Sequence, residues 1–196
     1  GLAELFQVAV GLMAVAVMRR CLPQADPYLR WPPRRSYAGL AVLIGAGMAL
    51  LMLVADYWPQ LISRTAPQGG YEMTALGIPG WLAVMFAAGP NEEIIFRGLL
   101  VGMLTVLVPG RVRLAQFEIP VSGVIVGLLF GAAHYGSFFN DPLYQAVAQQ
   151  LYAFLFGLTY VWLMERSRSL LAPMIAHGVG DLLEVAAVML LSVAWA

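Results

Sequence analysis

Seven ionisable side chains lie inside stretches of sequence that are otherwise apolar enough to sit in a lipid bilayer. A charged side chain at the centre of a bilayer costs roughly 2.5–3.5 kcal/mol on insertion scales, so such residues persist mainly where they pair or take part in chemistry. They are Glu92, Glu93, Arg97, His134, His177, Asp181 and Glu184, and they include both histidines of the chain. The set therefore marks a polar site within membrane-spanning segments.

The spacing of these residues places several of them on shared helix faces, because side chains four positions apart are neighbours on a helix. Three pairs have this spacing: Glu93 with Arg97, Phe130 with His134, and His177 with Asp181. Three segments thus each carry a polar stripe, and stripes of this kind avoid lipid by facing inward. We expect the three stripes to meet in one site.

The residue types favour hydrolysis of a peptide bond within the membrane. A carboxylate in a water-poor pocket suits a general base that takes a proton from water. Arg97 would hold its nearest carboxylate, most simply Glu93, in the ionised form and leave Glu92 free to exchange protons. The histidines could polarise a substrate carbonyl and stabilise the oxyanion, or hold a metal that does the same. Asp181 could orient His177 or accept a hydrogen bond from substrate backbone.

The three motifs resemble the signature of a known family of intramembrane proteases. They are Glu92-Glu93-xxx-Arg97, Phe130-xxx-His134 and His177-xxx-Asp181. The CAAX-protease and bacteriocin-processing (CPBP) family has EExxxR, FxxxH and HxxxN or HxxxD on three helices in this order. The resemblance covers about residues 78–184, and Asp181 takes the position where many members have asparagine.

This resemblance implies a role for each matching residue. Glu92 would activate the water, and Glu93 and Arg97 would support it electrostatically. Two histidines, His134 and His177, would bind the reacting centre, with Asp181 assisting the second.

Members of the family have been described both as metalloproteases and as metal-independent glutamic proteases. The chain has no HExxH motif, so we favour the glutamic mechanism without a cofactor. A zinc ion, if present, would be held by Glu92, His134 and His177.

Composition assigns the chain to the membrane. Of its 196 residues, 61% are hydrophobic and 11% charged, whereas soluble domains carry about 45–50% and about 25%. We therefore expect an all-α integral membrane protein: a single transmembrane domain over 1–196 with a CPBP-like catalytic core at 78–184.

A bilayer core about 30 Å thick needs roughly 20 helical residues. This predicts about six transmembrane helices in one bundle, within limits of five to eight. Their ranges are Leu2–Met18, Tyr37–Ala55, Ile78–Val108, Pro120–Tyr135, Leu143–Met164 and Leu170–Ala194.

The third of these segments is too long for one straight span. Proline removes a helical hydrogen bond, so we expect a break or kink at Gly89-Pro90. Three of the intervening segments are predicted to be loops: Asp56–Gly77, Pro109–Glu118 and Gly136–Pro142.

Arginine is distributed very unevenly among the loops. Alternating the six spans places nine arginines on one side and only Arg64 on the other. The positive-inside rule then assigns the arginine-rich side to the cytoplasm. The nine are Arg19, Arg20, Arg30, Arg34, Arg35, Arg111, Arg113, Arg166 and Arg168. We expect a multi-pass protein of a bacterial inner membrane.

Two other readings use the same residues. Intramembrane carboxylates and histidines also occur in transporters, and some CPBP proteins are thought to act in bacteriocin self-immunity, so a non-catalytic immunity or transport protein is the alternative. Gly178-Val179-Gly180-Asp181 matches the GxGD motif of aspartyl proteases, which need a second aspartate. The remaining candidates, Asp26, Asp56 and Asp141, are all predicted in loops.

The expected partners are a protein or peptide with a membrane-embedded segment and the lipid bilayer. No basic block indicates nucleic acid.

Overall fold

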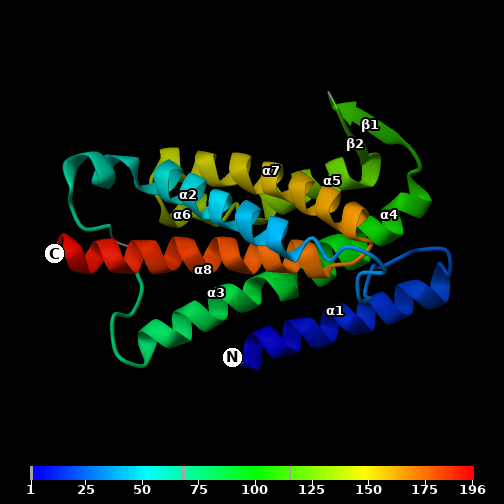
Figure 1. Ribbon diagram of the computed structural model, residues 1–196, viewed down its shortest axis with the longest axis horizontal. Coiled ribbons are helices and arrows are strands. Elements are labelled where there is room, and N and C mark those ends of the chain that lie inside the picture. The colour runs from blue at the N-terminus through cyan, green and yellow to red at the C-terminus, as the bar shows by residue number, and fades with distance from the viewer. Residues whose placement is uncertain (1, 68, 115) are drawn as a thin grey trace.

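The computed structural model describes residues 2–67, 69–114 and 116–196. Its elements follow one another as a series of helices interrupted by one short hairpin (Figure 1). They are α1 (Leu2–Cys21), α2 (Ala38–Ser63), α3 (Gly77–Glu93), the π-helix η1 (Ile94–Val101), α4 (Gly102–Leu107), β1 (Arg111–Leu114), β2 (Phe117–Pro120), α5 (Val121–Ala133), α6 (Ser137–Asn140), α7 (Leu143–Ser167) and α8 (Leu171–Ala194).

Within the described residues, four helical stretches are long and apolar enough to cross a membrane. They are Ala38–Ser63, Val121–Asn140, Leu143–Ser167 and Leu171–Ala194. Large apolar side chains such as Leu43 and Leu50 point out of the bundle instead of into it, as a lipid-facing surface requires. The prediction of an all-α multi-pass membrane protein is confirmed. The other two predicted spans correspond to α1 and to the continuous run α3–η1–α4.

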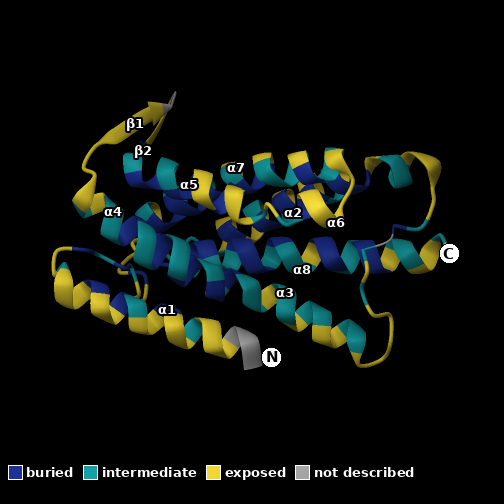
Figure 2. Ribbon diagram, turned by 180° about the vertical axis from the view of Figure 1, so that it is seen from behind, coloured by how far each residue is buried: buried dark blue, intermediate teal, exposed yellow. Residues whose placement is uncertain are grey.

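Helix α8 is the central element of the bundle. It packs against α2, α3 and α7, and much of its length is buried, whereas α1 lies at the edge with exposed side chains (Figure 2). Glycines allow the closest of these approaches. A Cβ at Gly45 of α2 would lie 2.5 Å from the Ala176 carbonyl oxygen, and one at Gly89 of α3 would lie 2.7 Å from the Gly178 nitrogen. Small residues at such crossings are how membrane helices gain van der Waals contact.

The connections between successive helices lie at opposite ends of the bundle, as the predicted order of spans requires. The ends of α1, α4 and α7 and the starts of α2 and α8 lie at one end of the bundle (right in Figure 1), while the end of α2 and the start of α3 lie at the other. The arginine-bearing segments gather at the first end. There Arg111 of the hairpin donates two hydrogen bonds to Glu165 of α7, each 2.9 Å long.

The predicted loop Asp56–Gly77 is wrong over its first part, because α2 continues to Ser63. Asp56 is buried within this helix and accepts a hydrogen bond of 2.9 Å from the Tyr152 hydroxyl of α7. The helix bends at Tyr57, whose φ of −122° departs from helical values, two residues before Pro59. A buried polar partner on another helix thus keeps a charged residue inside the span.

A break or kink is predicted at Gly89-Pro90, and the break is wrong. Helix α3 continues through Pro90 to Glu93, and the Ile94 N–H donates to the Pro90 carbonyl. Proline leaves the carbonyl four residues earlier, that of Phe86, without its helical donor. This carbonyl lies against Gly178 of α8, where a Cβ would approach to 2.6 Å. The neighbouring helix therefore accommodates the proline, and the irregularity appears further on, as the π-helix from Ile94 to Val101.

Two other predicted loops contain regular structure. Residues 109–118 were expected to be irregular, yet Arg111–Leu114 pairs antiparallel with Phe117–Pro120. Arginine alternates there with Val112 and Leu114, the two-residue period of a strand. Within the predicted loop Gly136–Pro142, Ser137–Asn140 forms a short helix.

The contact between α2 and α8 can be tested with two alanine substitutions on one helix. Gly45→Ala should lower the free energy of unfolding by about 1–3 kcal/mol, because its methyl group would overlap the Ala176 carbonyl. Gly47→Ala is the control, since a Cβ there meets nothing within 4 Å. It should leave stability unchanged or raise it by up to about 1 kcal/mol. Thermal unfolding in detergent measures both, and equal effects would contradict the proposed packing.

Candidate active site

A buried ion pair lies at the core of the candidate site. Glu93 and Arg97, one turn apart, have no exposed side-chain surface, and Arg97 Nη1 donates to Glu93 Oε1 over 2.9 Å. His177 of α8 reaches the same oxygen from the other side, with Nδ1 at 2.9 Å. One carboxylate oxygen therefore joins α3, η1 and α8.

Aromatic rings surround the Arg97 guanidinium. Its central carbon lies 4.2 Å from the ring centroid of Phe130 and 4.9 Å from that of Tyr160. Nitrogens Nε and Nη2 have no hydrogen-bond partner among the described residues, and the ring faces supply cation–π attraction instead. Gly157 of α7 leaves room for the group, since a Cβ there would lie 3.3 Å from Nη2.

Glu92 has the opposite environment from its neighbour. Its side chain is 37% exposed, and its Oε2 lies 3.9 Å from His177 Nε2. The same Nε2 lies 3.4 Å from Asp181 Oδ2, one helical turn further along α8. His177 therefore stands between Glu93, which engages Nδ1, and two carboxylates that face Nε2.

His134 follows the last residue of α5 and is held by its own backbone. Its Nδ1 lies 2.8 Å from the Phe130 carbonyl oxygen. Because a carbonyl only accepts hydrogen bonds, Nδ1 carries the proton and Nε2 is the nitrogen left for other partners. The Phe130 ring meets both histidines edge to face, with centroids 5.2 Å from His134 and 5.7 Å from His177.

A cavity of about 380 Å³ adjoins these residues. Four of the six predicted site residues line it, namely Glu92, His134, His177 and Asp181. The other two, Glu93 and Arg97, lie behind them in the protein interior. The structure thus brings the three predicted motifs together in one place.

The cavity extends toward the end of the bundle that lacks the arginine-rich loops. Its lining includes Gly69 and Tyr71 from the α2–α3 connection and Asp141 from the α6–α7 connection. Burial raises the pKa of Tyr71, so its phenol remains a neutral hydrogen-bond donor near the opening.

Sequence reasoning missed Tyr160, although it touches the site directly. Its ring stacks on that of His177, with centroids 5.0 Å apart and planes 15° apart. The signal was present as Tyr152, Phe156 and Tyr160, spaced four residues apart along one face of α7. Aromatic residues at this spacing are ordinary in a membrane span, so only the position of His177 gives Tyr160 its significance.

Glu184 and Asp56 also line the cavity. Asp56 lies within α2 and not in the predicted loop, so it becomes a candidate for the second aspartate of a GxGD mechanism. Asp56 accepts a hydrogen bond from the Tyr152 hydroxyl, whereas Asp181 faces His177 Nε2, so the two aspartates contact different partners. A GxGD mechanism needs two aspartates that share a proton. The first glycine of the motif, Gly178, has a packing role, because a Cβ there would lie 2.6 Å from the Phe86 carbonyl oxygen.

The three side chains that could hold a zinc ion, Glu92, His134 and His177, are not gathered as a metal-binding group. In the described ranges, no group of three or more His, Cys, Asp or Glu side chains could hold a metal ion. Both Nδ1 atoms are engaged, that of His134 by a carbonyl and that of His177 by Glu93, so each histidine would meet a ligand through Nε2. Metal-binding histidines are oriented in the same way.

A cavity-facing carboxylate beside two histidines, inside a bundle of membrane helices, is an arrangement suited to an intramembrane hydrolase. The family model described as type II CAAX prenyl endopeptidase, Rce1-like, matches residues 74–183, more than half of the chain. The chain therefore belongs to this family, which confirms the resemblance to CPBP proteases. Membership makes it a membrane protease with a protein substrate. No curated protein and no solved structure matches the chain.

The contrast between the two glutamates predicts unequal effects on stability. Glu93→Gln removes one partner of a buried ion pair, so it should lower the free energy of unfolding by about 3–5 kcal/mol. Glu92→Gln makes the same substitution on the neighbouring, partly exposed side chain. It should alter the free energy of unfolding by about 0.5 kcal/mol or less. Chemical denaturation in detergent compares them. Similar losses in the two proteins would refute the assignment of Glu93 as the buried partner.

Proposed function

We propose that the chain is an intramembrane endopeptidase in which Glu92 activates the water that attacks the peptide bond. The observation that carries this proposal is the opposite placement of two adjacent carboxylates. Glu93 is fully buried and bound by Arg97 and His177, whereas Glu92 faces the cavity. Of the two glutamates, Glu92 is the one with the access to water that a general base needs.

In the first step, the water oxygen bonds to the substrate carbonyl carbon while Glu92 takes one water proton. The carbonyl oxygen becomes negatively charged. His177 is placed to stabilise it, because its Nδ1 is held by Glu93 and, in the imidazolium form, its Nε2–H could turn from Asp181 to donate to this oxygen. The unprotonated Nε2 of His134 can accept the second proton of the water in a hydrogen bond and so orient it.

In the second step, the carbon–nitrogen bond breaks and Glu92 returns its proton to the leaving amine. The new carboxyl group and the new amine then leave the cavity. Arg97 never touches substrate in this scheme; with Glu93 it fixes the orientation of His177.

The proposed substrate is a membrane-embedded or C-terminal tail segment of another protein. The cavity opens at the end opposite the arginine-rich loops. If those loops face the cytoplasm of a bacterial cell, as the positive-inside rule favours, the cavity opens toward the outer side. That orientation suits trimming of exported proteins.

Cleavage can be tested with a pool of synthetic single-span and C-terminal tail peptides in detergent. We expect the purified protein to cleave members of the pool and Glu92→Gln to slow cleavage by about 10²–10⁴-fold, the usual contribution of a general base. Mass spectrometry of the products measures both.

Asp141→Asn is the matched control, because it also changes a carboxylate to an amide on the cavity lining. It should cleave at close to the parent rate. A Glu92→Gln protein with parental activity would exclude Glu92 as the base, and a parent protein that cleaves nothing in the pool would favour the non-catalytic alternative.

The mechanism predicts that metal removal has no effect on the rate. Protein dialysed against a strong chelator should retain its full cleavage rate, with elemental analysis showing less than about one metal ion per ten molecules. Loss of activity that added zinc restores would overturn the glutamic mechanism and leave the protease assignment standing.

The proposed orientation predicts which side of the membrane each connection faces. Cys21, the single cysteine, is exposed at the arginine-rich end, and Phe139 is 80% exposed at the other end. A membrane-impermeant maleimide should label Phe139→Cys in a Cys21→Ser background from outside intact cells. The parent Cys21 should react only after the membrane is opened, and the reverse pattern would invert the topology.

A further inference from the structure

A recess unrelated to the catalytic cavity lies at the arginine-rich end of the bundle. Two segments far apart in the sequence form its walls, the loop before α2 and the end of α7. Its volume is about 740 Å³. It is lined by Pro33, Arg34, Arg35, Tyr37, Arg166, Ser167 and Arg168, with no acidic residue among them.

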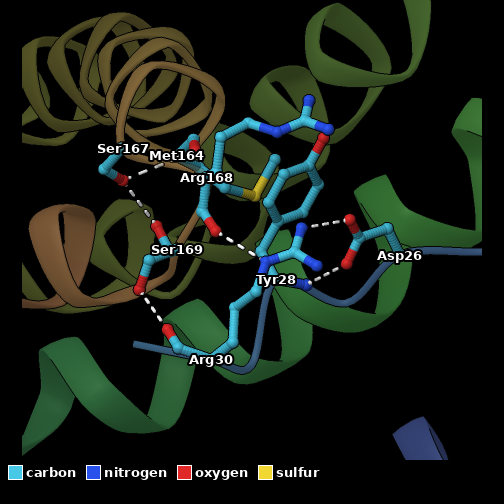
Figure 3. Close-up of polar contacts among 7 residues, drawn as sticks. All are labelled: Asp26, Tyr28, Arg30, Met164, Ser167, Arg168 and Ser169. Carbon is cyan, nitrogen blue, oxygen red and sulfur yellow. Dashed lines mark hydrogen bonds and ion pairs between the residues drawn. The ribbon is translucent and has the colours of Figure 1, made fainter. Parts of the chain in front are cut away.

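Hydrogen bonds lock the two segments together beside this recess (Figure 3). Arg30 Nε donates to the Arg168 carbonyl over 2.9 Å, and the Ser169 hydroxyl donates to the Arg30 carbonyl over 2.5 Å. The Leu170 N–H donates to the Tyr28 carbonyl over 3.0 Å. The recess is therefore built on a fixed frame, not on two independent loops.

The arginines of the frame and of the recess differ in how their charge is balanced. Arg30 pairs with Asp26, and Arg111 nearby pairs with Glu165. Within the described chain, the four recess arginines have no ion pair. Four arginines therefore line one hollow that has no acidic residue in its wall, and Arg166 and Arg168 also line a neighbouring hollow that contains Glu118 and Glu165.

Aromatic rings position two of these guanidiniums without neutralising them. The central carbon of Arg166 lies 5.6 Å from the Trp162 ring, and that of Arg168 lies 5.5 Å from the Tyr28 ring. Such contacts orient the planar group while leaving its N–H donors available. Arginine forks of this kind match the oxygens of a phosphate group.

We propose that this recess binds the phosphate group of an anionic membrane lipid. It lies where α2 begins at Ala38 and α7 ends at Ser167, the level at which lipid headgroups meet membrane helices. Basic pockets between helices at this level bind anionic headgroups, and Tyr37 is a residue type that prefers the interface. Free inorganic phosphate offers the same chemistry, so the experiment separates the two sources. The inference does not depend on proteolysis.

The test measures lipid binding to the purified full chain by native mass spectrometry in detergent. The probes are phosphatidylglycerol, phosphatidylcholine with matched acyl chains, and inorganic phosphate. We expect tighter binding of phosphatidylglycerol than of phosphatidylcholine, and no competition by millimolar phosphate.

Two triple variants with equal loss of charge locate the site. The recess variant is Arg34→Gln, Arg35→Gln and Arg166→Gln. The control is Arg19→Gln, Arg20→Gln and Arg113→Gln, which removes three arginines of the same end outside the recess. The recess variant should bind phosphatidylglycerol about tenfold more weakly or worse, and the control within about twofold of the parent.

Each other outcome overturns the proposal. Equal weakening in both variants would mean that a diffuse positive surface attracts the lipid, with no particular site. Equal binding of the two lipids by the parent would mean that the phosphate of an anionic lipid is not selected. Displacement of the lipid by inorganic phosphate would make free phosphate the ligand.

Discussion

The ion pair between Arg97 and Glu93 is the constraint on which the rest of the interior depends. A guanidinium without exposed surface is tolerable in a membrane protein only where a carboxylate and polarisable rings replace water. Glu93 supplies the carboxylate, and Phe130 and Tyr160 supply the rings. Since these come from α3, α5 and α7, the charge can be accommodated only when those helices are already packed. Gly157 is part of the same requirement, because a larger residue would occupy the space of the guanidinium.

This buried pair also explains how two adjacent glutamates acquire different tasks. Consecutive residues on a helix point about 100° apart, given 3.6 residues per turn. When Arg97 and His177 draw Glu93 into the interior, Glu92 is turned toward the cavity. Two adjacent glutamates therefore differ in position, with Glu93 holding the interior together and Glu92 facing the cavity.

Local spacing and the energetic cost of burying charge were enough to predict most residues of the candidate site from the sequence. Charged residues inside apolar segments identified Glu92, Glu93 and Arg97, and four-residue spacing paired His177 with Asp181. The errors arose where a distant partner decides the outcome. Asp56 is inside a helix because Tyr152, 96 residues later, hydrogen-bonds to it. Pro90 stays within its helix, and the Phe86 carbonyl that the proline frees lies against Gly178 of another helix. Neither partner is visible in a window of local sequence.

Helix α8 combines packing and chemistry in a way that limits how either can vary. His177 and Asp181 face the site, while Gly178 between them lies against the backbone of α3. In lipid, helices lack a hydrophobic driving force toward one another, so such close contacts hold them in register. A methyl group at Gly178 would push α3 and α8 apart at the level of His177, and Glu93 on α3 must stay 2.9 Å from that ring. The small residues of the bundle therefore set the distance between Glu93 and His177 as directly as the polar residues do.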